Sequence, residues 1–176
     1  MAEPDIDEVM TAYAADAVVF AKTNFDLTLD FSEESVEKLE TIAETLYQSR
    51  PKGFWSKLFR TGPSSDDVQT VCKMLGGYLG EVLRRRKGGA WALHEELNVV
   101  GLRRGESWLF PPDKVHRRLT YGDDENLWIY FRIVLAEPWE KKSARGRAGS
   151  VTAAEVAALH ARDARERPTH VPSTGR

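Results

Sequence analysis

The chain has very little cysteine and no long hydrophobic run. Cys72 is the single cysteine among 176 residues, which excludes an intrachain disulfide and a zinc site built from four cysteines. The longest apolar stretch, Leu127 to Ala136, contains Arg132 and is shorter than the roughly 18 residues that a membrane-spanning helix needs. The acidic N-terminus also lacks the basic start and apolar run of a secretory signal. We therefore expect a cytoplasmic protein that does not associate with membranes.

The common nucleotide-binding and catalytic motifs are missing as well. The sequence contains no P-loop, no G-x-G-x-x-G and no G-x-S-x-G. The stretch from His94 to Asn98 resembles the H-E-x-x-H zinc motif only superficially, because Asn98 stands where that motif needs its second histidine. The sequence thus predicts neither a metal site nor a cofactor.

The overall charge is small, with 25 basic against 27 acidic residues. Residues 1–50 hold 12 acidic and three basic residues, whereas residues 138–176 hold four acidic and eight basic residues. A dedicated nucleic-acid-binding protein usually has a strong basic excess over the whole domain. We therefore do not expect nucleic-acid binding to be the main function, although weak phosphate contacts through basic segments stay open.

Apolar periodicity predicts an α+β fold of four or five helices packed on a small antiparallel sheet of three or four strands. We expect residues 1–138 to form a single globular domain and residues 139–176 to form a basic tail, largely disordered or weakly helical. Strict alternation from Phe25 to Phe31 indicates a half-buried strand or extended arm. The expected helices are 5–22, 32–48, 65–87, 113–121 and 127–135, and the expected strands are 90–94, 98–102 and 107–110.

Three glycines inside the predicted helix 65–87 indicate a close contact. Gly76, Gly77 and Gly80 each weaken a helix by about 1 kcal/mol relative to alanine, so another backbone is expected to approach this face. Glu81 follows directly, and a carboxylate buried there needs partners. We expect either a weak pair with Arg85 on an exposed face or, on a buried face, hydrogen bonds to the Trp91 Nε1–H, Lys114 or Arg117.

Basic residues recur in the second half of the chain. The run Arg84–Lys87, together with Arg103, Arg104, Lys114, Arg117 and Arg118, could form a positive face, with Trp91, Trp108 and Phe110 interleaved among them. Such a basic and aromatic face suits an acidic protein partner. The absence of catalytic motifs, together with the uneven distribution of charge along the chain, favours a non-catalytic protein-binding module, of the immunity or adaptor kind.

Two other functions stay open from the residues alone. One is a small enzyme or ligand-binding domain that uses Glu81 with His94 or His116, which requires these groups to converge on one cleft. The other is weak nucleic-acid binding through the basic face. The sequence does not define the oligomeric state. The candidate binding or structural residues are Glu81, Trp91, His94, Trp108, Lys114, His116 and Arg117.

Three blocks of the sequence resemble a family of uncharacterised bacterial domains. The first block is Leu29-Asp30-Phe31-Ser32, and the central block is Gly77-Tyr78-Leu79-Gly80-Glu81 followed by Gly88-Gly89-Ala90-Trp91. The third block begins at Phe110-Pro111-Pro112-Asp113-Lys114. The resemblance covers roughly residues 25–136. The family has no assigned activity, so the resemblance implies a shared fold and no particular reaction.

Overall fold

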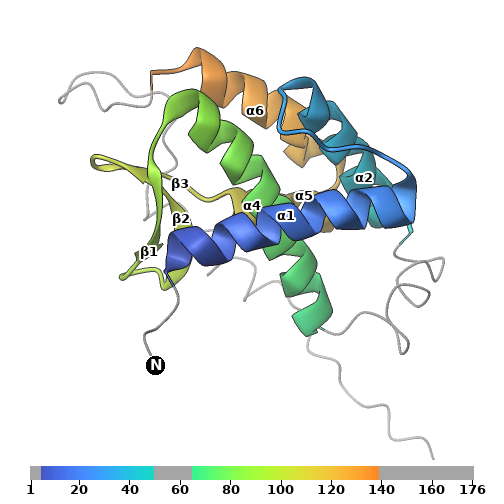
Figure 1. The fold of residues 1–176 in the computed structure, drawn as a ribbon, viewed down its shortest axis with the longest axis horizontal. Coiled ribbons are helices and arrows are strands. Elements are labelled where there is room, and N and C mark those ends of the chain that lie inside the picture. The colour runs from blue at the N-terminus through green and yellow to red at the C-terminus, as the bar shows by residue number, and fades with distance from the viewer. Residues whose placement is uncertain (1–4, 50–64, 139–176) are drawn as a thin grey trace, which may run out of the picture. The chain divides into compact units, whose positions relative to one another are not determined.

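The computed structural model describes residues 5–49 and 65–138, and within these ranges the protein is α+β, as the sequence predicts. Five α-helices pack together, and a three-stranded antiparallel sheet lies at one side of them, next to the start of α1 (Figure 1). The predicted tail 139–176 lies outside the described residues. None of the described helices has both the length and the apolar character needed to cross a membrane. The elements are α1 Ile6–Phe25, α2 Glu34–Gln48, α4 Ser65–Lys87, β1 Ala90–His94, β2 Val99–Arg104, β3 Ser107–Leu109, α5 Pro111–Tyr121, the 3₁₀ turn η1 Asp123–Glu125 and α6 Leu127–Ala136.

The glycines of α4 are sites of close contact, as the sequence predicts. α4 crosses behind α1 in Figure 1 and also packs on α5. A Cβ atom at Gly76 would lie 2.4 Å from the Cα of Pro112, and one at Gly80 would lie 2.2 Å from the Trp91 ring. At Gly77 a Cβ would lie 3.1 Å from the carbonyl oxygen of Met10 in α1. The absence of side chains here lets three elements pack directly against α4.

The sheet has the order β1-β2-β3, and its two faces differ. Trp91 pairs with Leu102, and both are buried on the face that joins the core. Because side chains alternate along a strand, His94 on β1 projects from the opposite face. At the free edge of β1, the backbone N–H of Trp91 donates to the Asp7 carboxylate at 2.9 Å, which ties this strand to the first turn of α1.

The segment from Phe25 to Phe31 has the predicted alternation of burial but is not a strand. Leu27 and Leu29 pack on the core, whereas Asp26, Thr28 and Asp30 are exposed. Positive φ angles of 54° at Asp26 and 61° at Phe31 bend the chain at both ends, so it forms an extended arm that pairs with none of the described strands. The Tyr78 hydroxyl accepts a hydrogen bond of 2.7 Å from the Phe31 N–H and secures the end of this arm.

Candidate functional site

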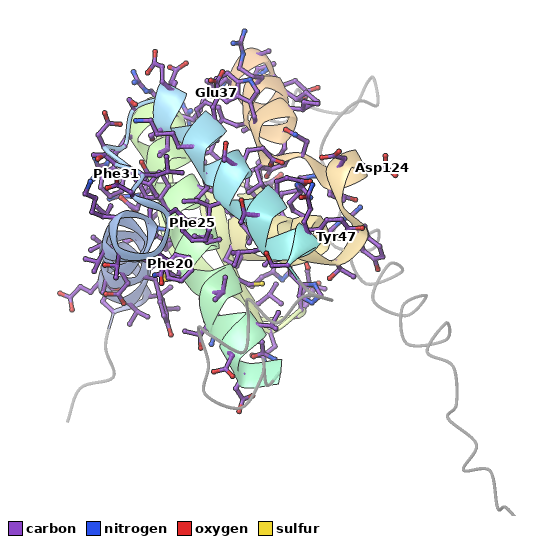
Figure 2. All side chains as sticks on the ribbon, turned by 90° about the vertical axis from the view of Figure 1, so that its right-hand side faces the viewer. Phe20, Phe25, Phe31, Glu37, Tyr47 and Asp124 are labelled. Atoms are coloured by element: carbon purple, nitrogen blue, oxygen red, sulfur yellow. The ribbon has the colours of Figure 1, made fainter. Side chains whose placement is uncertain are left out.

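The outer face of α6 is an exposed apolar surface on a helix whose inner side packs on the core. Leu127 and Phe131 are fully buried in the core, whereas Ile129 is 58% exposed and Ile133 is 51% exposed. In Figure 2, α6 stands beside α2, and Asp124 marks the turn that precedes it. A shallow hollow on the outer side is lined by Trp128, Ile129, Arg132, Ile133 and Ala136, and we call these five residues the α6 face.

Side chains from other helices hold both ends of α6. At the N-terminus, Glu40 Oε2 of α2 accepts a hydrogen bond of 2.7 Å from the Leu127 N–H. At the C-terminus, Lys87 Nζ of α4 donates to the carbonyl oxygens of Leu135 at 2.9 Å and Glu137 at 2.8 Å. A carboxylate at the start of a helix and an ammonium group at its end both complement the helix dipole. These contacts fix α6 in place while its outer side stays open.

The N-terminal anchor of α6 depends on a buried arginine. Arg118 of α5 is fully buried, and its Nε donates to Glu40 Oε1 at 2.8 Å. It also forms ion pairs with Glu44 and with Asp123. Although burial alone would lower the pKa of Arg118, the hydrogen bonds that it donates to Glu40 and Glu44 raise it. The placement of Arg118 on a positive surface, suggested by the sequence, is therefore wrong, because its charge is neutralised inside the protein.

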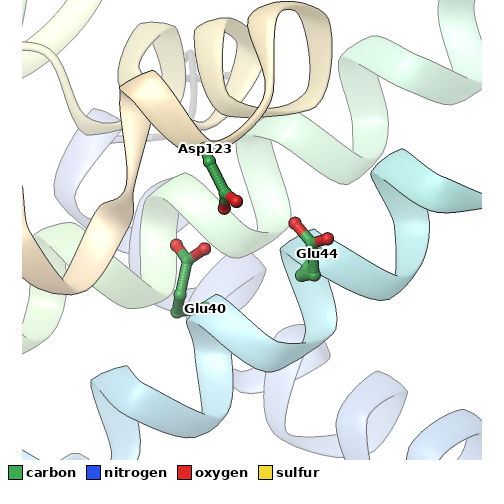
Figure 3. A group of neighbouring side chains, drawn as sticks. All are labelled: Glu40, Glu44 and Asp123. Atoms are coloured by element: carbon green, nitrogen blue, oxygen red, sulfur yellow. The ribbon is translucent and has the colours of Figure 1, made fainter.

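The same three carboxylates lie close enough together to ligate a metal ion. Glu40 and Glu44 project from α2 toward Asp123 of η1 (Figure 3), and their ligand oxygens lie within 4.8 Å of one another. The guanidinium of Arg118 already provides the positive charge that such a cluster needs. A hydrogen bond from Arg118 lowers the pKa of Glu44. We therefore interpret this cluster as a structural ion-pair network.

Glu81 is a buried carboxylate with partners on both α4 and β1. Its side chain is 1% exposed, and it accepts hydrogen bonds from Arg84 at 2.8 and 2.9 Å and from Trp91 Nε1 at 2.9 Å. Burial alone would raise the pKa of Glu81, but the hydrogen bonds from Arg84 and Trp91 hold it below the ordinary value. The predicted hydrogen bond with Trp91 is confirmed, and the side chain of Arg85 is more distant at 3.9 Å.

Lys114 and Arg117, the other predicted partners of Glu81, bind Glu125 instead. Lys114 Nζ lies 2.5 Å from Glu125 Oε2, and Arg117 forms an ion pair with Oε1 of the same carboxylate. Burial favours a higher pKa for Glu125, yet these two cations keep it below the ordinary value. The prediction failed because α5 turns both side chains toward η1, which follows it in the chain.

The structure does not bring the predicted histidines to Glu81. Among the described residues, the hydrogen bonds and ion pairs of Glu81 go to Arg84, Arg85 and Trp91. His94 projects from the opposite side of the sheet to Trp91, where its ring lies 4.8 Å from the ring of Trp108. His116 is exposed on α5. An enzyme that uses Glu81 with His94 or His116 needs these side chains to converge on one cleft. The structure does not bring them together.

The predicted positive face is divided among internal contacts. Arg84 pairs with Glu81, and Arg85 stacks over the Phe31 ring at 3.8 Å from its centroid. Arg86 lies 3.4 Å from Glu33, and Lys87 binds the end of α6. What stays together on the outer side of the sheet is a smaller group, in which Arg103 lies over Trp108, beside His94 and Phe110.

Comparison of the chain with protein-family models, with curated proteins and with solved structures finds no match. The resemblance to uncharacterised bacterial domains therefore stays a prediction from the sequence.

The α6 face was not among the residues singled out from the sequence. A signal was available, because the run from Leu127 to Ala136 contains one charged residue and is apolar on every side. A helix that packs on a body from one side cannot bury all of its surface. Such a run on a short helix that packs from one side therefore indicates exposed apolar residues.

Proposed function

We propose that this protein is a non-catalytic protein-binding module, of the immunity or adaptor kind, and that it docks its partner on the α6 face. The observation that supports this proposal is the exposure of Ile129 and Ile133 beside Trp128 on one helix. Single apolar residues on a surface are common, but adjacent large ones mark interaction sites more often.

The rigid support of α6 adds to this proposal. A ten-residue helix is marginal in water on its own, yet α6 is anchored by Glu40 at one end and Lys87 at the other. A surface that is already ordered loses less conformational freedom when it binds. The catalytic alternative has weaker support, because Glu81 is occupied by Arg84 and Trp91.

Co-purification of the tagged full-length chain from its own cells tests the proposal. We expect Ile133→Asp to lose a protein that the parent retains, because a charge at the centre of an apolar interface must be desolvated. Val19→Asp is the matched control, since Val19 is 65% exposed in the middle of α1, away from α6.

Thermal melts of both variants should match the parent, which shows that the fold is intact. A partner that both variants retain equally, or that Val19→Asp alone loses, would refute docking on the α6 face.

A further inference from the structure

The α6 face has the shape of a helix-binding surface. Ile129 and Ile133 form one row at a four-residue spacing, and Trp128, Arg132 and Ala136 form a second row beside it. Rows at this spacing make ridges with grooves between them, and the ridges of another helix fit into such grooves. The side chains project less from the helix at the C-terminal end of the face, because the last residue there is Ala136.

The face contains one charged group, and it is positive. Arg132 is exposed in the centre of its row, and its guanidinium carbon lies 5.4 Å from the centroid of the Trp128 ring. The other four residues that line the hollow are apolar. A partner that covers this face removes water from Arg132, and a carboxylate on the partner compensates for the lost solvation best because it carries the opposite charge.

A second copy of the chain does not meet this requirement well. In a two-fold symmetric contact each patch meets itself, so the Arg132 side chains of the two copies would approach each other near the centre of the helix pair. Like charges brought together in an interface weaken it. The charge on the α6 face therefore favours a different partner over self-association.

We infer that the partner presents an amphipathic helix in which apolar side chains surround an aspartate or glutamate that pairs with Arg132. This inference rests on the proposed docking function and adds the chemistry of the partner. The apolar residues fill the groove beside Ile129 and Ile133, and the carboxylate selects the correct register along α6.

Two synthetic helical peptides of about 18 residues, long enough to hold helical structure, serve as probes. Both have leucine at helical spacing on one face, and they differ only in a central glutamate or lysine on that face. Fluorescence anisotropy of the labelled peptides gives their affinities for the full-length parent and for Arg132→Glu. We expect the parent to prefer the glutamate peptide by about tenfold and Arg132→Glu to prefer the lysine peptide by a similar factor.

The controls separate this inference from the docking proposal. If Arg132→Glu and the parent bind both peptides equally while Ile133→Asp loses both, the charge inference is wrong and the docking surface stands. If the parent binds neither peptide, the inference of a helical acidic partner is wrong, and the co-purification experiment decides on docking independently. A dimer in sedimentation that Ile133→Asp abolishes would identify a second copy as the occupant and would also overturn the inference.

Discussion

Replacing Glu81 with glutamine separates a structural role for this carboxylate from a catalytic one. The substitution keeps the shape of the side chain and removes its charge. In the folded protein Glu81 accepts hydrogen bonds from both Arg84 and Trp91. The glutamine oxygen can still accept one of them, but its NH₂ group must then face a donor of Arg84 or Trp91, and that donor loses its acceptor.

The expected loss follows from the burial of the two partners. Removing one member of a buried ion pair lowers the free energy of unfolding by about 3–5 kcal/mol. The Arg84 side chain is 34% exposed, so water can solvate the guanidinium after its partner is removed, and the loss is smaller. We expect Glu81→Gln to lose about 2–3 kcal/mol, which corresponds to a fall in melting temperature of about 4–12 °C for a chain of this length.

Circular dichroism melts and urea titrations measure this change. Glu96→Gln is the control, because Glu96 is exposed in the turn between β1 and β2, and its melt should match that of the parent. A melt of Glu81→Gln that overlays the parent would refute the structural role. That result would instead favour a role for Glu81 in binding a ligand.

Two further predictions concern the packing of α4 and the response to acid. Gly80→Ala should destabilise the protein by about 1–3 kcal/mol, because the new Cβ would lie 2.2 Å from the Trp91 ring; a melting temperature above that of the parent would mean that improved helix propensity outweighs the clash. The pKa values of Glu44, Glu81 and Glu125 are held below the ordinary value, so the unfolded state binds more protons in acid. The stability they contribute is present at neutral pH and is lost as the pH falls below about 4.3. Urea midpoints from pH 7 to pH 3 should fall, and fall less steeply in Glu81→Gln; midpoints that do not change with pH would contradict this assignment.

The elements whose ends carry local signals were predictable from the sequence. Strand β1 has the predicted bounds, because Gly88 and Gly89 adopt positive φ angles of 80° and 99° and separate it from α4. The predicted helix 113–121 starts two residues later than α5, which begins at Pro111. Proline has no N–H to donate, and the first turn of a helix needs none.

The burial of Arg118 was predictable only in part from the sequence. Val115, Arg118 and Leu119 share the three- and four-residue spacing of one helix face, and the structure buries all three. The neighbouring Arg117 lies on another side and binds Glu125. The spacing indicated that Arg118 faces inward, but its partners Glu40 and Glu44 are more than 70 residues away, and long-range pairing of this kind cannot be deduced from local pattern.

The hydrogen bond between Asp7 and the Trp91 N–H has a consequence for how copies of this chain behave in concentrated solution. A strand at the margin of a sheet offers unpaired N–H groups, and another chain can add a strand of its own there. In β1 the N–H of Trp91 is occupied by a carboxylate, which an incoming strand would have to displace while also meeting its negative charge. The first turn of α1 therefore protects this margin against edge-to-edge aggregation.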